Sequence, residues 1–529
     1  MTSNTISHQD SLAFLHHLQD WMDYLCRLLD RCGDSTERIK YQRQLRWLLG
    51  FFEGTNLSLK HNLMINNLYL GTSAVDDSLV ITPLEPIQDC YQQRGHAFEL
   101  IEKAHNAETL FLIQGPPGTG KTTAICELVL QTLKANPQAR ILIASETHVA
   151  VDNALDRICA EVDPELVQRI YRHSAYADGS QLQSPQATST VLLEKANDIW
   201  TSAYLAAPEL TEALWQRFAN DNDLPPNWLA KNLADDQLLV GVTCNQIEHL
   251  IDGLSKPYDL AIVDECSKAT LPEWLMAVSV ATKAVLVGDH QQLPPTFCRA
   301  ESDALAELTK QQETLIRDGV IDRLFEHAPP SIKGTLTTQY RMQPNIGQFI
   351  SEAFYQGQLH HGRSQSVRPE HNFGWLGYPR EELCPDPNIP KEQQVLRNSQ
   401  EVAVIQNALM QLAKVSKQPR SVAVITPYRA QAQALREMVD NLDFSELTIE
   451  VDTVDAFQGR QADVVFFSFV RNNGSALFYG DSRRINVALS RAKDHVYLVG
   501  DRNYLRQQSR YPVLQKLLKL PVLWRWKSN

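Results

Sequence analysis

The stretch GPPGTGKT, residues 115–122, places glycines, a lysine and a threonine at the spacing GxxxxGK[ST]. It lies between an apolar run, 109–114, and a helical pattern over 121–134. Glycines let backbone N–H groups approach phosphate oxygens, and a helix N-terminus adds its dipole. The expected nucleotide-binding residues are Gly115, Pro116, Pro117, Gly118, Thr119, Gly120, Lys121, Thr122 and Thr123. Within this set, we expect Lys121 to reach the β- and γ-phosphates and Thr122 to bind magnesium.

A pair of acids, Asp264 and Glu265, ends a second apolar run, 259–264. Carboxylates at the edge of a core are costly unless a charge compensates them. A magnesium nucleotide at the ends of parallel strands needs an acid for the metal and a base for water. We therefore predict that Asp264 holds magnesium through a water molecule and that Glu265 takes the proton from the attacking water. Taken alone, such a pair is typical of the start of a solvated loop. Together with the upstream glycine loop, however, it favours an ATP-hydrolysis site.

Short apolar runs between helical segments predict buried parallel strands that position these groups. The expected strands are 109–114, 140–145, 238–243, 259–264 and 284–288, followed by 421–426, 449–453, 463–470 and 495–500. We predict an α/β fold with two parallel-sheet units, each with helices on both faces. The expected domains are a helical hairpin with a small β region over 1–87, a first α/β domain over 88–330 with a helical insertion over 164–236, and a second over 331–529.

Composition is ordinary for a globular protein, with 43% hydrophobic and 21% charged residues. The net charge of −12 argues against a broad basic nucleic-acid surface, although a local basic groove remains compatible with it. Nine scattered cysteines without a CxxC pair argue against a usual zinc site and suit a reducing compartment. The polar N-terminus does not resemble a secretory signal, and no apolar run has transmembrane length. We expect a cytoplasmic protein without a membrane partner.

Six motifs occur in a fixed order that resembles the motor of superfamily 1 helicases. They are GPPGTGKT, DEC (264–266), GDHQQLPP (288–295), QYRMQP (339–344), VDAFQGR (454–460) and RRINVALSRAK (483–493). The similarity covers roughly 90–500 and is greatest to the 5′→3′ subgroup of the nonsense-mediated decay RNA helicase, Senataxin and their bacterial relatives. The resemblance implies two RecA-like domains with ATP and Mg²⁺ in the cleft between them.

The resemblance also implies roles for residues outside the glycine loop. Gln292 is similar to the γ-phosphate sensor, and Tyr340 to the residue that stacks on adenine. Arg341 and Arg491 match two arginines that meet the γ-phosphate, and such groups are worth about 10³–10⁵ in rate. Two further nucleotide contacts are Gln93, or its neighbour Gln92, at the adenine edge and Gln461 at the ribose.

Four residues match positions that contact the nucleic-acid backbone in the family. They are Thr147, Thr243, Pro427 and Thr453. Threonines at strand ends are also frequent plain caps and turns, so each contact competes with a local role. Hydroxyl and backbone donors along a channel grip any sequence and need little net positive charge. The basic segment 38–46 either contacts nucleic acid or forms the solvated face of a helix.

The sequence departs from the family pattern at several of these motifs. Lys268 replaces a glutamine after the acidic pair and either substitutes for a hydrogen bond to the sensor or forms an ion pair. Glu146 and His148 replace proline and asparagine, and Glu146 is expected to point away from a phosphate track. Gln343 replaces a histidine, and Gln461 replaces a glutamate, which puts ribose discrimination in doubt. None of these changes removes an expected catalytic residue.

The sequence favours an ATP- and Mg²⁺-dependent helicase or translocase on single-stranded DNA or RNA. A second hypothesis is an ATP-gated clamp that grips nucleic acid without separating strands. A third is a P-loop ATPase that acts on proteins or metabolites, with hydrolysis indifferent to oligonucleotides. We expect a monomer, with a protein partner for the N-terminal region, and the sequence leaves the choice of DNA or RNA open.

Overall fold

The computed structural model describes residues 8–52, 81–92, 95–163, 166–169, 238–247, 256–317, 320–365, 368–377, 396–442, 446–457, 459–474, 476–508 and 510–525. The chain divides into two compact units. The first comprises Met1–Gly115, Lys121–His290 and Pro294–Leu336, and the second comprises Pro116–Gly120, Gln291–Leu293 and Thr337–Asn529. The expected domain boundaries at 87/88 and 330/331 stay predictions.

The first unit is built on a seven-stranded parallel sheet in the order β3-β4-β2-β5-β6-β1-β7. Its strands are β1 (Leu110–Gln114), β2 (Ile141–Ser145), β3 (Val167–Arg169), β4 (Leu239–Thr243), β5 (Leu260–Asp264), β6 (Ala284–Gly288) and β7 (Lys333–Thr335). Four of them, β2, β4, β5 and β6, are buried along their whole length because helices cover both faces.

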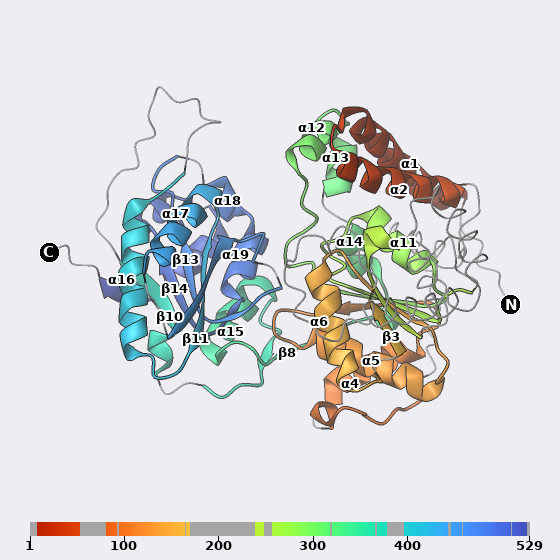
Figure 1. Ribbon diagram of the computed structural model, residues 1–529, viewed down its shortest axis with the longest axis horizontal. Coiled ribbons are helices and arrows are strands. Elements are labelled where there is room, and N and C mark those ends of the chain that lie inside the picture. Colours follow the sequence, from red (N-terminus) through yellow and green to blue (C-terminus); the bar gives the residue numbers. More distant parts are fainter. Residues whose placement is uncertain are drawn as a thin grey trace, which may run out of the picture. The chain divides into compact units, whose positions relative to one another are not determined.

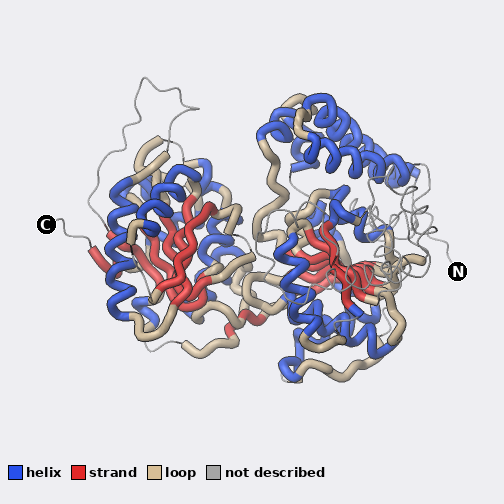
Figure 2. The backbone as a smooth tube through the Cα atoms, in the orientation of Figure 1, coloured by secondary structure: helices blue, strands red, loops and turns tan. Residues whose placement is uncertain are grey.

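The helices of the first unit lie on both sides of this sheet (Figures 1 and 2). They are α1 (His8–Arg31), α2 (Ser35–Phe52), α4 (Gly95–Asn106), α5 (Lys121–Ala135), α6 (His148–Cys159), α11 (Leu271–Ser279), α12 (Arg299–Leu305), α13 (Lys310–Arg317) and α14 (Val320–His327), with the short 3₁₀ turns η1 (Asp89–Tyr91), η4 (Cys244–Gln246) and η5 (Pro330–Ile332). In Figure 1, α4 and α5 lie on one side of the sheet, and α11 and α14 on the other. The α1–α2 hairpin packs on the α11 and α12 side.

The second unit contains a six-stranded parallel sheet in the order β12-β11-β13-β14-β10-β15. Its strands are β10 (Phe373–Gly377), β11 (Arg420–Thr426), β12 (Leu447–Thr453), β13 (Ala462–Ser468), β14 (Ala492–Val499) and β15 (Val522–Arg525), beside a small parallel pair, β8 (Thr338–Gln339) and β9 (His360–His361). Its helices are α15 (Pro344–Phe354), α16 (Ser399–Val415), α17 (Arg429–Asp440), α18 (Leu477–Gly480), α19 (Ser482–Leu489), α20 (Arg502–Gln507) and α21 (Pro512–Leu518), with η6 (Pro369–His371).

Strand β13 shows why both faces of the second sheet are covered. Its side chains alternate between two separate apolar clusters: Val464 and Phe466 join one, and Val465 and Phe467 join the other. Successive side chains of a strand point to opposite faces, so each face has its own core. This arrangement confirms the predicted fold class of two parallel-sheet α/β units.

Two regional predictions differ from the structure or lie outside it. The helical insertion expected over 164–236 is wrong at its start, because Val167–Arg169 form strand β3 at the edge of the first sheet. A three-residue strand is too short to show periodicity, and Arg169 is buried there because its guanidinium binds Asp152. The remainder, 170–236, and most of the β region expected over 55–87 lie outside the described residues. Within the described part of the chain, no helix is long and apolar enough to cross a bilayer.

Candidate active site

The glycine loop turns sharply between β1 and α5. The backbone angle φ is +74° at Gly118 and +88° at Gly120, a region that side chains disfavour. At Gly115 a Cβ atom would lie 2.1 Å from Cγ of Lys121, because the lysine side chain folds back over this residue. The Lys121 ammonium donates to the Gly115 carbonyl at 3.0 Å. These glycines therefore keep a backbone cradle open at the N-terminus of α5.

The two acids lie at the carboxyl end of β5, beside the lysine. Asp264 is only 5% exposed, and its carboxylate accepts the N–H of Glu265 at 2.8 Å. The ammonium of Lys121 lies 3.6 Å from Oε1 of Glu265. The structure thus brings together Lys121, Asp264 and Glu265 at one edge of the first sheet, with Thr122 and Thr123 half-buried in the first turn of α5.

Burial, and after it the Glu265 carboxylate, together raise the pKa of Asp264 to about 7, although Lys121 opposes the shift. The backbone at Glu265 has φ of +51°, which is uncommon for a residue with a side chain. Two backbone hydrogen bonds hold this turn: Lys268 donates to the Glu265 carbonyl at 2.9 Å, and Cys266 donates to Val287 at 3.0 Å. A buried, partly neutralised carboxylate on a strained turn is suited to a bound cation.

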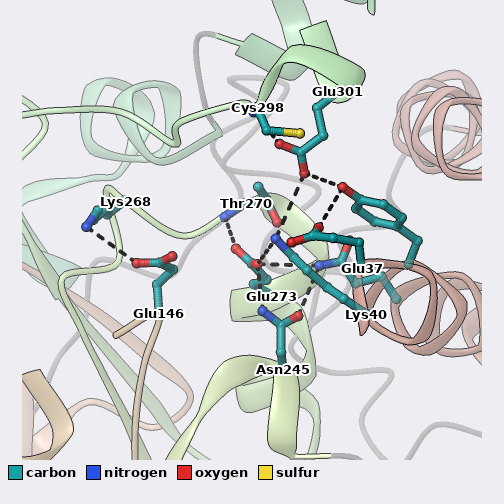
Figure 3. Close-up of polar contacts among 11 residues, drawn as sticks. Glu37, Lys40, Glu146, Asn245, Lys268, Thr270, Glu273, Cys298 and Glu301 are labelled. Carbon is teal, nitrogen blue, oxygen red and sulfur yellow. Dashed lines mark hydrogen bonds and ion pairs between the residues drawn. The ribbon is translucent and has the colours of Figure 1, made fainter. Parts of the chain in front are cut away.

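Lys268 forms an ion pair, which is one of the two roles expected for it. Its ammonium lies 3.6 Å from the carboxylate of Glu146, which follows β2, and the two side chains face each other in Figure 3. Glu146 therefore points toward the turn that carries Glu265. Sequence reasoning did not connect the two positions because the ion pair joins residues of two different strand ends.

The segment before α4 is anchored by contacts that the sequence did not predict. The buried carboxylate of Glu127 accepts the backbone N–H groups of Ile87 and Gln88, at 2.8 and 2.9 Å. The Gln88 amide donates to the Thr123 carbonyl at 3.0 Å. Gln93 lies outside the described residues, while Gln92 donates to Asp89 within η1. The glutamine with a contact to the α5 first turn is thus Gln88, five residues before the predicted one.

In the second unit, two arginines lie on neighbouring segments. Arg491 is 3% exposed and donates to the side-chain oxygen of Gln292 at 2.8 Å. Arg341 donates to the carbonyl of Ser490 at 3.1 Å. The Tyr340 backbone N–H donates to the carbonyl of Gly118 at 2.8 Å, and Gly118 also belongs to this unit. The structure therefore groups Gln292, Arg341 and Arg491, the three residues expected to sense the γ-phosphate.

Arg363 is a residue of this group that the sequence did not reveal. Its guanidinium donates to the carbonyls of Arg341 and Lys493, at 2.6 and 3.0 Å, and to the Asp494 carboxylate at 2.8 Å. The segment that carries Arg341 is thereby fixed to the segment that follows Arg491. A lone arginine in a loop after β9 carries no pattern from which this role could be predicted. Gln461 is exposed, in the loop before β13.

The four predicted nucleic-acid contacts form two pairs, each at the carboxyl edge of a sheet. β2 and β4 are neighbours, so Thr147, two residues after β2, and Thr243, the last residue of β4, lie at adjacent strand ends. Thr147 caps α6 by accepting the Ala150 N–H at 3.3 Å. Thr243 is 6% exposed, and its hydroxyl donates to Gln246 at 2.9 Å. Both hydroxyls therefore have the local roles that compete with a phosphate contact.

The second pair lies on the second unit. β11 and β12 are neighbours with Thr426 opposite Thr453, so Pro427 is next to Thr453 at that edge. The Thr453 amide donates to its neighbour Asp452 at 2.8 Å. Beside Pro427, the hydroxyl of Tyr428 accepts from Arg471 at 2.8 Å, a further cation that sequence reasoning did not identify.

Comparisons with known proteins match most of the chain. One AAA-domain family matches residues 92–204 and 209–300, and another AAA-domain family matches 316–503. The chain is 28% identical to rat DNA-binding protein SMUBP-2 over 90% of this chain and 48% of that protein. It is 28% identical to the DNA polymerase alpha-associated DNA helicase A of Saccharomyces cerevisiae, over 75% of this chain and 63% of the relative.

An uncharacterised ATP-dependent helicase of Methanocaldococcus jannaschii is 27% identical over 79% of this chain and 69% of its own length. The chain spans about half the length of the SMUBP-2 proteins that it matches. Over most of its length the chain is therefore similar to two AAA-domain families and to proteins that are named as DNA or ATP-dependent helicases.

Proposed function

We propose that the chain couples ATP hydrolysis to movement along single-stranded nucleic acid, as a translocase or helicase. The observation that carries the proposal is the cluster at the edge of the first sheet, where the Lys121 ammonium lies 3.6 Å from Glu265 and Asp264 is buried next to it. A backbone cradle, a cation and two carboxylates are the parts that phosphoryl transfer to water requires. A solvated glycine turn would need none of them.

The residues present fit ATP with Mg²⁺. Magnesium is usually bound by one or two protein oxygens together with phosphate oxygens and waters. Thr122 would supply a protein oxygen directly, and Asp264 would hold the ion through a bound water. Among the described residues, no group of three or more metal-binding side chains offers a different kind of site. When bound, Mg²⁺ would neutralise phosphate charge and lower the cost of ionising Asp264.

The remaining chemistry belongs to the chain's own side chains. Lys121 contacts the Gly115 carbonyl and Glu265, and it would exchange those contacts for phosphate oxygens when a nucleotide binds. Glu265 would accept the proton of the attacking water. Arg341 and Arg491 would stabilise charge that develops on the phosphoryl group. Gln292, which accepts a hydrogen bond from Arg491, would sense the γ-phosphate.

We further propose 5′→3′ polarity and membership of the subgroup of the nonsense-mediated decay RNA helicase and Senataxin. Both rest on the motif resemblance. The names of the relatives, which include a DNA-binding protein and a DNA helicase, support nucleic acid as the partner.

The test measures ATP hydrolysis with and without matched single-stranded DNA and RNA oligonucleotides, with Lys121→Ala as the inactive control. Stimulation by either oligonucleotide supports the proposal, and hydrolysis indifferent to both would refute it in favour of an ATPase acting on another substrate. Strand separation is then measured on duplexes with a 5′ or a 3′ tail. Separation of the 5′-tailed duplex alone is expected, whereas turnover without separation of either would establish a clamp.

A further inference from the structure

One face of helix α2 is polar and is directed into the first unit (Figure 3). Lys40, Tyr41 and Gln44 lie at helical spacing on this face, and Tyr41 and Gln44 are each 3% exposed. Buried polar groups of this kind require partners. The segment 38–46 thus serves neither as a fully solvated face nor as an open basic surface, because at least these three side chains are committed to the first unit.

The polar face of α2 contacts two glutamates. One carboxylate oxygen of each glutamate contacts α2, and the other accepts a backbone N–H at the start of a helix. Glu273 accepts the backbone N–H of Thr270 at 2.8 Å, at the beginning of α11. Glu301 accepts the backbone N–H of Cys298 at 2.7 Å, at the beginning of α12. Both carboxylates are nearly buried, at 2% and 8% exposure, so their second oxygens also need donors.

The second oxygens bind different residues of α2. Oε1 of Glu273 lies 3.4 Å from the Gln44 amide nitrogen, which also donates to Asn245 at 3.0 Å. Oε1 of Glu301 accepts the Tyr41 hydroxyl at 2.9 Å. Gln44 therefore contacts the acid at the α11 start, and Tyr41 contacts the acid at the α12 start.

Lys40 serves both acids. Its ammonium lies 3.6 Å from Glu273 and 4.0 Å from Glu301. Burial lowers the pKa of Lys40, but Glu273 and Glu301 outweigh this effect and leave the pKa raised, so the cation persists at neutral pH. Without this charge, two nearly buried carboxylates would face each other uncompensated.

The hairpin is also attached on its α1 side. Gln312 of α13 donates to Asp20 at 2.6 Å, and Arg27 and Arg31 both pair with Glu307, which follows α12. Helix α2 is therefore held from behind while its polar face reaches the two helix starts.

The segment that precedes each of these two helices carries predicted ATP-site residues. α11 begins after the turn 264–270, which holds Asp264 and Glu265, and α12 begins after the segment 289–298. We propose that helix α2 is a positioning element of the ATP site, in which Gln44 fixes the end of the first segment, Tyr41 fixes the end of the second, and Lys40 couples them. This inference rests on the proposed function and gives the N-terminal hairpin a role in it.

The proposal separates two contacts that a general stabilising role would not separate. The variants are Gln44→Met and Tyr41→Phe, which keep the side-chain volume, together with Lys40→Met, Lys40→Arg and the exposed control Gln42→Met on the same helix. Amide hydrogen exchange is measured on the nucleotide-free full chain in peptides covering 264–270 and 289–298. ATP hydrolysis is measured in parallel as kcat and KM.

We expect Gln44→Met to speed exchange about tenfold in 264–270 only, because Glu273 and Asn245 lose the Gln44 amide as a donor. Tyr41→Phe should speed exchange about tenfold in 289–298 only, because Glu301 loses the Tyr41 hydroxyl as a donor, while the second contact of that hydroxyl, to Glu37, lies within α2. Lys40→Met should affect both segments, with substantial rescue by Lys40→Arg. In all three, kcat should fall about tenfold with KM for ATP nearly unchanged, because the catalytic groups shift while the glycine loop is untouched. Gln42→Met should match the wild type.

Equal acceleration of both segments by Gln44→Met and by Tyr41→Phe would overturn the proposal, since the hairpin would then only stabilise the unit as a whole. Wild-type exchange in both variants would overturn it as well. If the wild type itself hydrolyses no ATP, the proposed function fails, but the exchange experiment still decides whether α2 positions the two segments. The two failures are therefore distinguishable, and the mild Tyr41→Phe change keeps the test available if Lys40→Met does not fold.

Discussion

Asp264 is expected to destabilise the nucleotide-free protein, and Asp264→Asn to stabilise it. The carboxylate is 5% exposed, and burial together with Glu265 raises its pKa from 3.8 to about 7. Asparagine has the same shape and can still accept the Glu265 N–H, but it carries no charge. The substitution thus removes the cost of a buried charge while keeping the hydrogen bond.

The size of the effect follows from the two pKa values. Below pH 3.8 the carboxyl is protonated in the folded and unfolded states and contributes nothing. Between 3.8 and about 7 the unfolded chain ionises first, so the free energy of unfolding falls as the pH rises. Since one pKa unit is about 1.4 kcal/mol, the loss is on the order of 2 kcal/mol at pH 5.5 and 4 kcal/mol at pH 8.

The assay is urea unfolding of the nucleotide-free wild type and Asp264→Asn at a series of pH values from 5.5 to 8. The advantage of the variant should grow by about 2 kcal/mol over this range. Asp259→Asn, an exposed acid just before the same strand, is the matched control and should show no such growth. Added Mg²⁺ and a non-hydrolysable ATP analogue should stabilise the wild type far more than Asp264→Asn.

A difference between wild type and Asp264→Asn that is independent of pH would refute the reasoning. It would mean that the carboxyl ionises equally well in both states, so that Lys121 compensates its burial completely. Equal stabilisation of both proteins by Mg²⁺ and the analogue would instead refute the metal-binding role, while leaving the cost of burial intact.

Three other substitutions probe the remaining parts of the site. Glu265→Gln should lower ATP turnover by about 10²–10⁴ while a fluorescent nucleotide still binds, and full turnover would exclude this residue as the base. Gly115→Ala should weaken ATP binding roughly tenfold, because its Cβ would lie 2.1 Å from Cγ of the loop lysine, whereas Gly95→Ala, with nothing within 4 Å, should bind normally. Arg363→Met should lower kcat roughly tenfold with ATP affinity retained, because Arg341 loses the guanidinium that holds its carbonyl, and Arg363→Lys should recover only part of it.

The sequence was sufficient for the central strands and the nucleotide loop. β5 is a short apolar run that ends in Asp264, and β6 is a short apolar run that Asp289 follows. Their predicted and observed bounds differ by one residue at most. Strands β3 and β7 of the first sheet and β10 and β15 of the second were not predicted. β3, β7 and β15 are edge strands of three or four residues, and β10 is interrupted by Gly374, so none has the continuous run on which the prediction depended.

The contacts between site residues were less accessible than the residues themselves. Ordered motifs identify Arg341 and Glu265, but a motif does not encode which backbone carbonyl or acid lies next to it. The ion pair of Lys268 with Glu146 joins segments more than 20 residues apart, and so does the hydrogen bond from the Arg363 guanidinium to the Arg341 carbonyl. Such contacts depend on strand order, which a single sequence leaves open.

The turn that carries the two acids combines a disfavoured backbone angle with a buried carboxylate. Both raise its free energy, so contacts from distant residues are needed to hold it. A backbone φ of +51° at Glu265, a residue with a side chain, costs on the order of 1–3 kcal/mol. The preceding residue, Asp264, adds a buried carboxylate. Such a turn persists only when its surroundings over-determine it. One end continues strand β5, which is paired on both sides, and the other end is α11, whose first turn depends on Glu273. The strand end cannot move without breaking the sheet, so relaxation of the turn must proceed through α11, and a contact from α2 to Glu273 opposes that movement.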